Sequence, residues 1–531
     1  MPSASLSHHS RLEIFVGLGL TLLALVILTA YEVTHTTGYS FGQAVYTVSD
    51  FDEGVYLATG ALMAHGFALY SQIYNAQPPV FPLALSLGDR LFGNVIVTGR
   101  LTLLFFAFVA VLACAAIALQ VRGWIAAGLA AILLVLSPEF LVYSHAIEEE
   151  VPMMALGAVS LACALWWWKT QRLLPAAAAG VFFCLAVLTK FFAFSLLLPV
   201  LVMVALTIWD NRHAQDGIPI TRILRAGAGF VVGAVVPVGL SFAIWGQNEW
   251  NQMVGDRITA TSGPAALQQE SHLHLLRDLA STDPGLTVLA VIGGILLLVA
   301  DWRMGLVIGS WMLATLVILM RYHPLFGHHL VILLAPTAVL AGICVSFAIP
   351  NRSGSGQTRL ETAEDRGSAQ PSTGPSRLRG RGMEITALAG VSLYIALIVH
   401  LVYSYPDLLV TQSTGDHTLA SAGALVAKHT TAGAFVVTGD PWICVYANRN
   451  CVPGLVDTSD VRIETRKLSS QQAIAYTVNA NPAAIALARG LCLLPKYPHW
   501  VQSNDRYQLL RRYPFDDHQH CATGIYLRKA S

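Results

Sequence analysis

Residues 95–119 read VIVTGRLTLLFFAFVAVLACAAIAL, an apolar run that carries a single charge, that of Arg100. A helix of about 20 apolar residues crosses the roughly 30 Å hydrocarbon core of a lipid bilayer. The whole chain shares this character, because 55% of its 531 residues are hydrophobic and only 12% are charged. A soluble domain carries about 25% charged residues. The sequence therefore predicts a membrane protein, and its formal net charge of +1 gives no reason to expect a nucleic-acid partner.

Apolar runs of similar length recur along the chain and predict an all-α polytopic membrane bundle with about eleven transmembrane helices. The first run lacks a small-residue cleavage site, so we expect an uncleaved anchor. Residues 32–94 form the predicted first outer loop, with short surface helices at 55–68 and 80–91. The predicted spans are residues 12–31, 95–119, 124–142, 151–168, 173–188, 191–209, 223–245, 285–300, 304–320, 329–348 and 385–402.

The loops between the spans differ in charge, and this difference predicts the orientation. If the N-terminus is cytoplasmic, most lysines and arginines of the loops lie on the cytoplasmic side, as the positive-inside rule requires. An odd number of spans then places the C-terminal region outside the cytoplasm. We therefore expect a multi-pass protein of the cell membrane with a cytoplasmic N-terminus and an extracytoplasmic C-terminal domain.

The composition changes after the bundle. Helical patterns at 419–428 and 469–478 alternate with strand patterns at 434–438, 483–487 and 524–528, which is typical of a small α/β domain. A stretch rich in Ser, Gly, Arg, Thr and Pro precedes it and predicts disorder. The predicted order is a membrane domain over 1–349, a disordered cytoplasmic linker over 350–382, a last transmembrane helix over 383–403 and an extracytoplasmic α/β domain over 404–531.

The cysteines of the C-terminal region indicate its redox environment. An even number there suits two disulfides in an oxidising compartment, and four cysteines allow three pairings. Four free thiols are the alternative, and a zinc site is disfavoured because no two of them are spaced as C-x-x-C. These cysteines are Cys444, Cys451, Cys492 and Cys521.

An acidic stretch follows the first span. It reads Asp50-Phe51-Asp52-Glu53-Gly54-Val55-Tyr56 and holds three carboxylates within four positions. Charges this close together at a membrane surface are rare in so apolar a chain unless they have a function. We interpret Asp52 and Glu53 as the acidic centre of an active site.

With the predicted orientation, other unusual polar residues collect on the same side of the membrane. A carboxylate can take the proton from an attacking hydroxyl, and cations and histidines can stabilise a phosphate leaving group. The expected substrate is an amphiphile with its tail in the bilayer and its phosphate at the interface. The collected residues are Arg100, His145, Glu148, Glu149, Glu150, Lys190, Arg257, His272, Arg321, His323, His328 and His329.

The order of these residues resembles a known family. Asp52-Glu53, Tyr56, Gly66, Tyr70 and Pro78-Pro79 resemble the first outer loop of GT-C glycosyltransferases. The resemblance is closer to the family of protein O-mannosyltransferases and bacterial lipid A aminoarabinose transferases (glycosyltransferase family 39-like). Further matches, within residues 10–345, are Ser137-Pro138, Ser144-His145, Glu150-Val151-Pro152, Leu188-Thr189-Lys190, Arg321-Tyr322, His328-His329 and Pro336. The family commonly has arginine and aspartate where this chain has His145 and Glu150.

The resemblance implies an enzyme that moves a sugar from a polyprenyl-phosphate-linked donor to a hydroxyl of a protein, lipid or glycan acceptor. Transfer would be inverting and extracytoplasmic. Asp52 would be the catalytic base and Glu53 would position a substrate. Glu150 would be a second acidic contributor, with a divalent metal as the one cofactor to consider. The implied substrate-binding residues are Tyr56, Tyr70, Arg100, His145, Lys190, Arg321, His328 and His329.

Structural interpretations of the same residues stay open. Asp52 can act as the N-cap of the 55–68 helix, and Glu148–Glu150 can form a solvated turn before a helix. Lys190 can reach along the apolar surface to the interface, and His328 and His329 can be interfacial residues without a substrate. A transporter or flippase of a lipid-linked or anionic solute is the alternative function, because buried charges also line transport pathways.

Overall fold

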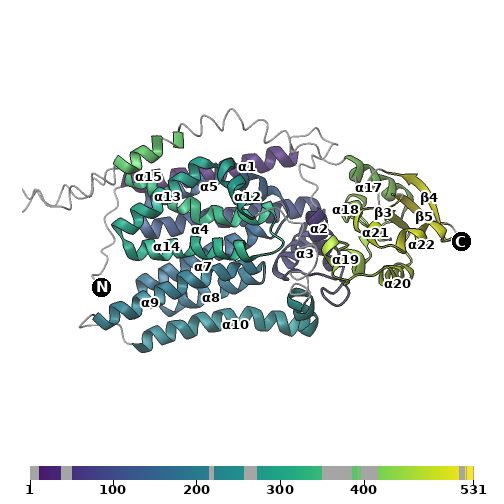
Figure 1. Cartoon of the computed structure of the whole chain (residues 1–531), viewed down its shortest axis with the longest axis horizontal. Coiled ribbons are helices and arrows are strands. Elements are labelled where there is room, and N and C mark those ends of the chain that lie inside the picture. Colours follow the sequence, from purple (N-terminus) through teal and green to yellow (C-terminus); the bar gives the residue numbers. More distant parts are fainter. Residues whose placement is uncertain are drawn as a thin grey trace, which may run out of the picture.

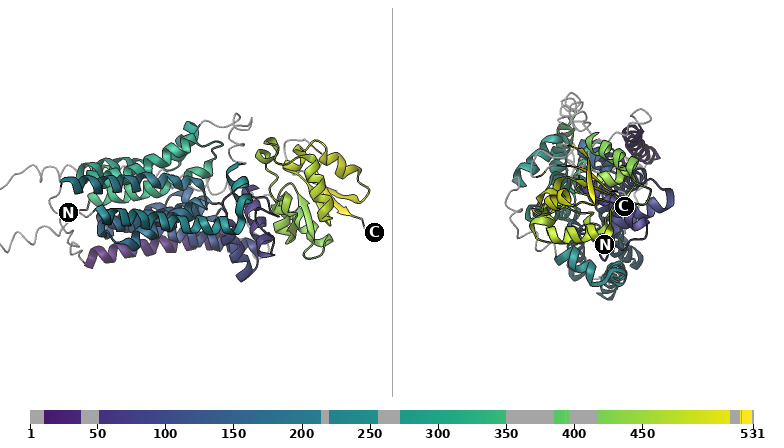
Figure 2. Two further views of the ribbon diagram at one scale, coloured as in Figure 1. Left: turned by 90° about the horizontal axis from the view of Figure 1, so that it is seen from below. Right: turned by 90° about the vertical axis from the view of Figure 1, so that its right-hand side faces the viewer.

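The computed structural model describes residues 11–37, 51–213, 220–255, 272–349, 385–392, 394–395, 417–513, 521 and 523–529. Long helices run side by side along the long axis of the molecule, and a mixed α/β region lies at one end of them (Figures 1 and 2). The predicted fold class, a helical membrane bundle with a small C-terminal α/β domain, is confirmed. The predicted linker and most of the span predicted at 385–402 lie outside the described residues.

Seven described helical segments are long and apolar enough to cross a membrane, and two bent helix pairs raise the number to as many as nine. The predicted number of about eleven is not confirmed. The helices of the bundle are α1 (Arg11–Thr37), α4 (Val95–Arg122), α5 (Trp124–Val135), α6 (Pro138–His145), α7 (Glu150–Thr170), α8 (Leu173–Val187), α9 (Leu197–His213), α10 (Ile220–Trp250), α12 (His272–Thr282), α13 (Pro284–Ala300), α14 (Trp302–Arg321) and α15 (Leu334–Phe347). Short helices η1 (Phe191–Leu196) and η4 (Gly327–Leu333), both 3₁₀, precede α9 and α15.

The span predicted at 124–142 is two helices. α5 and α6 meet at an angle of 69°, and the break falls at Ser137, whose backbone is extended immediately before Pro138. Proline lacks an N–H group and disfavours helical dihedral angles in the residue before it. The bend brings His145 within hydrogen-bonding distance of α1, and Ile147 within hydrogen-bonding distance of the helix at Phe51–Ala64.

Two helices of the segment between the first two spans, α2 (Phe51–Ala64) and α3 (Val80–Phe92), lie between the bundle and the C-terminal region (Figure 1). α2 begins at Phe51, earlier than predicted, so Asp52 and Glu53 belong to its first turn. The prediction of a surface helix is wrong for α2. Most of its side chains are buried, because α3, α4 and a helix of the C-terminal region pack against it.

The C-terminal region contains a five-stranded sheet in the order β2-β1-β3-β5-β4. Strand β1 (Phe435–Thr438) pairs in parallel with β2 (Asn450–Cys451) and β3 (Ala484–Leu487), whereas β5 (Gly524–Arg528) pairs antiparallel with β3 and β4 (Tyr507–Arg512). All three predicted strands and both predicted helices are present. The helices are α17 (His417–His429), α18 (Trp442–Ala447), α19 (Asp460–Glu464), α20 (Ser470–Ala480), α21 (Arg489–Leu493) and α22 (Tyr497–Ser503).

Two disulfides cross-link this region, as predicted. Cys444 pairs with Cys451, and Cys492 pairs with Cys521. The first disulfide joins α18 to β2, and the second joins α21 to the segment that precedes β5. The alternative of four free thiols is therefore wrong.

Candidate active site

Asp52 lies in the first turn of α2 and is half-buried. One helical turn later, the Tyr56 side chain is buried. Burial raises the pKa of the Tyr56 hydroxyl well above its ordinary value, and the negative charges of Glu149, Asp52, Glu150 and Glu148 raise it further. The charges of Asp52 and of the Glu148–Glu150 run therefore act on the same hydroxyl. α2 begins before Asp52, so this residue is not its N-cap.

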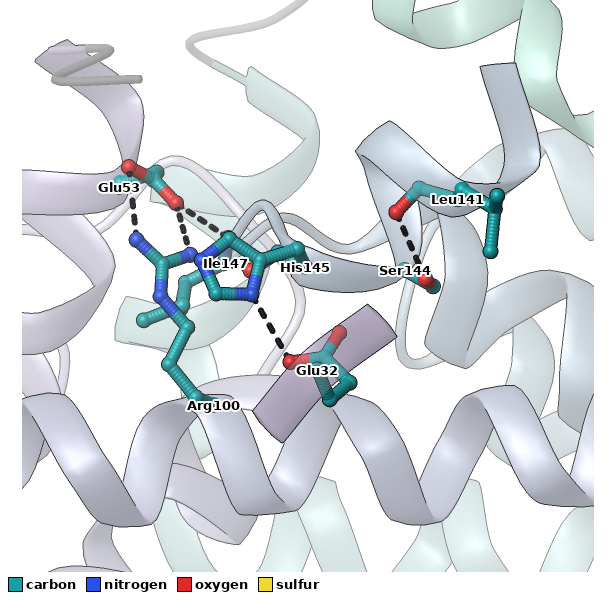
Figure 3. Close-up of polar contacts among 7 residues, drawn as sticks. All are labelled: Glu32, Glu53, Arg100, Leu141, Ser144, His145 and Ile147. Atoms are coloured by element: carbon teal, nitrogen blue, oxygen red, sulfur yellow. Dashed lines mark hydrogen bonds and ion pairs between the residues drawn. The ribbon is translucent and has the colours of Figure 1, made fainter. Parts of the chain in front are cut away.

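The neighbouring Glu53 points into the protein and has no exposed surface. Its Oε1 atom accepts hydrogen bonds from Arg100 Nη1 at 2.5 Å and from the N–H of Ile147 at 2.6 Å. Arg100 also donates to the carbonyl of His145 (Figure 3). The network joins α2, α4 and the segment after α6. Glu53 therefore fixes the start of α2, and with it the position of Asp52.

A buried pair extends this network to α1. His145 Nδ1 lies 2.8 Å from Glu32 Oε2, and both side chains are buried (Figure 3). The apolar run predicts that the first span ends at residue 31, so Glu32 was not a predicted site residue. A usable signal was present, because no glycine or proline interrupts residues 31–37, so the helix can continue past its apolar run.

A second cluster joins Glu150 at the start of α7, Lys190 before η1, and His328 and His329 in η4. Lys190 Nζ forms an ion pair with Glu150 Oε1. The same oxygen lies 3.7 Å from Nε2 of both histidines, and His328 Nδ1 lies 3.8 Å from Glu148 Oε2. Only 3% of the Lys190 side chain is exposed. The alternatives of a solvated glutamate turn and of a lysine at the interface are therefore wrong.

Among the residues that the structure describes, this cluster contains the group that could hold a metal ion. The potential ligand atoms of Glu150, His328 and His329 lie within 4.8 Å of one another. A cation would have to share Glu150 Oε1 with the Lys190 ammonium, although Glu150 Oε2 is buried and has no hydrogen-bond partner among the described residues.

The tautomer of His329 decides how well a metal fits. The N–H of Phe326 donates a hydrogen bond to His329 Nδ1 at 3.0 Å. The neutral ring then carries its proton on Nε2, the nitrogen that faces Glu150. A metal ligand must present an unprotonated nitrogen, so these residues fit a divalent metal poorly. Lys190 and His329 instead present N–H groups, which suit an oxyanion.

Two predicted site residues lie outside both clusters. The Tyr70 hydroxyl donates a hydrogen bond to the carbonyl of Gln77 at 2.7 Å, and the Tyr70 ring packs edge-on against Trp245 with ring centroids 6.0 Å apart. Tyr70 thus holds the loop between α2 and α3 against α10. Arg321 is exposed at the end of α14 and has no polar contact with either cluster in the part of the chain that the structure describes.

In fold, the helical bundle with its C-terminal α/β region is similar to solved glycosyltransferases of the GT-C type, so this chain has the GT-C fold. In sequence, residues 76–251 match the family model for dolichyl-phosphate-mannose-protein mannosyltransferases. The resemblance to this family and to the aminoarabinose transferases, inferred from the sequence, is therefore confirmed.

Solved structures give the extent of the likeness. ArnT from Cupriavidus metallidurans, bound to undecaprenyl phosphate, superposes with a TM-score of 0.60 at 16% identity and covers 97% of this chain and 98% of its own. The apo oligosaccharyltransferase of Archaeoglobus fulgidus has a TM-score of 0.53 at 12% identity, over 92% of this chain and 72% of its own. At these identities the likeness establishes the fold. No curated protein matches the chain by sequence.

Proposed function

We propose that the protein is an integral membrane glycosyltransferase that moves a sugar from a polyprenyl-phosphate carrier to a hydroxyl acceptor. The observation that carries this proposal is the buried Glu150–Lys190 ion pair with two histidines beside the same oxygen, together with Asp52 in the first turn of α2. Asp52 can accept a proton while the other group binds a phosphate. The similar structures support the donor class, since ArnT was solved with undecaprenyl phosphate and the archaeal AglB with dolichol phosphate.

The proposed reaction is a single displacement that inverts the anomeric carbon. Asp52 accepts the proton of the acceptor hydroxyl as its oxygen attacks the anomeric carbon of the sugar. The bond between that carbon and the phosphate oxygen breaks, and polyprenyl phosphate leaves with the bonding electrons. Lys190 and the two histidines of η4 stabilise the charge that develops on the phosphate. Glu53 is occupied by Arg100 and Ile147, so it positions Asp52 and is not a second base.

The carboxylate of Glu150 has a specific part in this scheme. It holds the buried Lys190 ammonium in an ion pair. A buried cation without a partner is strongly disfavoured. Glu150 therefore keeps Lys190 charged and in place until a phosphate arrives to share it.

The orientation follows the positive-inside expectation, with a cytoplasmic N-terminus and an extracytoplasmic C-terminal domain. The two disulfides of the C-terminal domain support this proposal, because disulfides persist in oxidising compartments outside the cytoplasm. Helix α2, which carries Asp52 and Glu53, packs against α18 of this domain (Figure 1). Transfer would therefore take place at the extracytoplasmic face.

The test is donor consumption by the purified protein in lipid nanodiscs. A panel of radiolabelled polyprenyl-phosphate sugars is supplied with Asp52→Asn in parallel. We expect the wild type to consume one donor and Asp52→Asn to lose activity by roughly 100-fold or more, because a positioned base contributes about 10²–10⁴-fold. The variant should insert and melt like the wild type. Wild-type turnover by Asp52→Asn would overturn the base assignment, and no consumption of any donor, with acceptors present, would favour a transporter.

The same assay tests metal dependence. Because His329 and Lys190 fit a cation poorly, we expect EDTA to leave donor consumption unchanged within about twofold. Elemental analysis should find no metal in the purified wild type that is absent from the purified His328→Ala variant. A stoichiometric metal, or activity that EDTA removes and a divalent cation restores, would contradict this expectation.

A further inference from the structure

The C-terminal domain contacts the membrane domain directly above α2. Trp442 at the start of α18 is fully buried, and a Cβ atom on Gly54 would lie 2.9 Å from its Cδ1 atom. Asn450 Oδ1 lies 2.7 Å from His65 Nδ1, and the guanidinium carbon of Arg462 lies 3.6 Å from the centroid of the Tyr74 ring. We call Trp442, Asn450 and Arg462 the docking face. It covers the helix whose first turn carries Asp52.

An ion pair lies at the edge of the sheet that faces α2. Arg489 Nε lies 3.0 Å from Asp440 Oδ2, and the Asp440 side chain is completely buried. Asp440 follows β1 and Arg489 follows β3. Because these strands are parallel neighbours, their carboxyl ends meet at one edge. This is the edge of an α/β sheet at which ligands bind.

The backbone at Arg489 is unusual. Its φ angle is +35°, in the left-handed region that residues other than glycine rarely adopt. Such strain persists only where the surrounding structure enforces it, and it is frequent at functional sites. Here the next residue, Gly490, packs without space for a side chain against the carbonyl of Thr458. The backbone at Arg489 is therefore held in this conformation by the packing of its neighbour.

The guanidinium lies near the start of α2. The guanidinium carbon of Arg489 lies 5.9 Å from the centroid of the Phe51 ring, and Phe51 immediately precedes Asp52. Within the part of the chain that the structure describes, Arg489 has one polar partner, Asp440, which lies beside its Nε atom. The Arg489 side chain is 34% exposed, so the guanidinium is accessible to a ligand.

We propose that Arg489 binds a carboxylate or phosphate group on the acceptor and so selects acidic acceptors. The inference rests on the proposed function. A guanidinium presents a planar pair of N–H donors that matches an oxyanion in two-point contact. Asp440 does not use all the N–H donors of Arg489, because one of its two oxygens, Oδ1, already accepts a hydrogen bond from the N–H of Trp442 at 3.1 Å. In the proposed reaction, Lys190 and the histidines of η4 bind the donor phosphate. The Arg489 guanidinium beside Phe51 is therefore assigned to the acceptor.

Binding is the first readout, because it needs no turnover. Saturation-transfer NMR on the full chain in nanodiscs compares glucose 6-phosphate, glucuronic acid and glucose. We expect the wild type to bind both acidic sugars and not glucose, and Arg489→Gln to weaken acid binding by roughly 10- to 100-fold, as for hydrogen bonds to charged groups. Arg489→Lys should be intermediate. Equal binding of glucose, or acid binding retained by Arg489→Gln, would overturn the proposal.

Two variants control this comparison. Arg511→Gln removes an arginine of the same domain that also lies against an aromatic ring, 5.0 Å from the centroid of Tyr513, but on β4 at the far edge of the sheet. It should bind like the wild type. The double variant Asp440→Asn/Arg489→Gln removes the buried carboxylate together with its cation, so no unpaired charge stays in the protein interior. It should fold and still fail to bind the acids, and acid binding by this variant would also overturn the proposal.

Kinetics locates the oxyanion. With an acidic acceptor, Arg489→Gln should raise the acceptor KM by roughly tenfold or more while the donor KM stays unchanged. A change in the donor KM at saturating acceptor would place the anion on the donor and overturn the assignment. If the wild type consumes no donor at all, the proposed function fails, and the binding comparison still decides the role of Arg489.

Discussion

Two adjacent carboxylates in the first turn of α2 have opposite surroundings. Asp52 is half-buried beside Tyr56, whereas Glu53 is closed off by Arg100 and by the backbone of Ile147. A carboxylate that accepts hydrogen bonds from a guanidinium and a backbone N–H is held in place. In the proposed reaction, Asp52 therefore transfers the proton and Glu53 positions the start of α2.

The Glu53–Arg100 pair makes a prediction at the scale of single residues. Arg100→Gln leaves Glu53 buried without its cation, which is expected to destabilise the protein by about 3–5 kcal/mol. The double variant Glu53→Gln/Arg100→Gln should lose less than the sum of the two single losses, because the partners share one interaction. Thermal unfolding in detergent micelles measures both.

Arg90→Gln serves as the matched control. Arg90 donates to the carbonyl of Met63 at 2.6 Å from an exposed position on α3, and we expect its loss to shift stability by less than about 1 kcal/mol. If Arg100→Gln melts like Arg90→Gln, or if the double variant is additive, the buried pair does not hold α2 in place.

At the scale of elements, the contact between α2 and α18 makes a second prediction. Gly54 has no room for a side chain, since an added Cβ atom would lie 2.9 Å from the backbone nitrogen of Trp442. Gly54→Val should therefore separate the helices at a cost of about 1–3 kcal/mol, typical of overpacking. Hydrogen exchange should rise in α18 and in the first turn of α2, and donor consumption should fall.

Gly19→Val is the control for this substitution. Gly19 lies on α1 and an added Cβ atom there would meet nothing within 4 Å. The variant should exchange and turn over like the wild type. Unchanged exchange in α18 of Gly54→Val would show that the C-terminal domain does not depend on this contact.

The positions of the elements were largely predictable, and their pairings were not. Apolar runs mark most spans because bilayer thickness sets helix length. The bend at Ser137 was visible in principle from Pro138, but its direction depends on packing. The two histidines of η4 were predicted as phosphate contacts, whereas their joint contact with Glu150 joins segments far apart in sequence. No local pattern encodes that contact.

At the scale of the whole molecule, the site is built from both ends of the chain. α2 contributes Asp52, η4 contributes the histidines, and the docking face comes from the C-terminal domain. Composition identified the two regions, but it could not predict that α18 lies on α2. Such a contact depends on shape, here a tryptophan against a glycine. For the same reason Arg489 and Asp440 carried no sequence signal.

This arrangement has a consequence for how the protein is made. A ribosome synthesises the chain from its N-terminus, so α2 emerges long before Trp442, Asn450 and Arg462 exist. A nascent chain can insert its first helices and pair Glu53 with Arg100, yet α2 stays uncovered until the C-terminal domain has been made. Premature termination between the bundle and that domain would therefore release a protein that has α2 but lacks the domain that covers it.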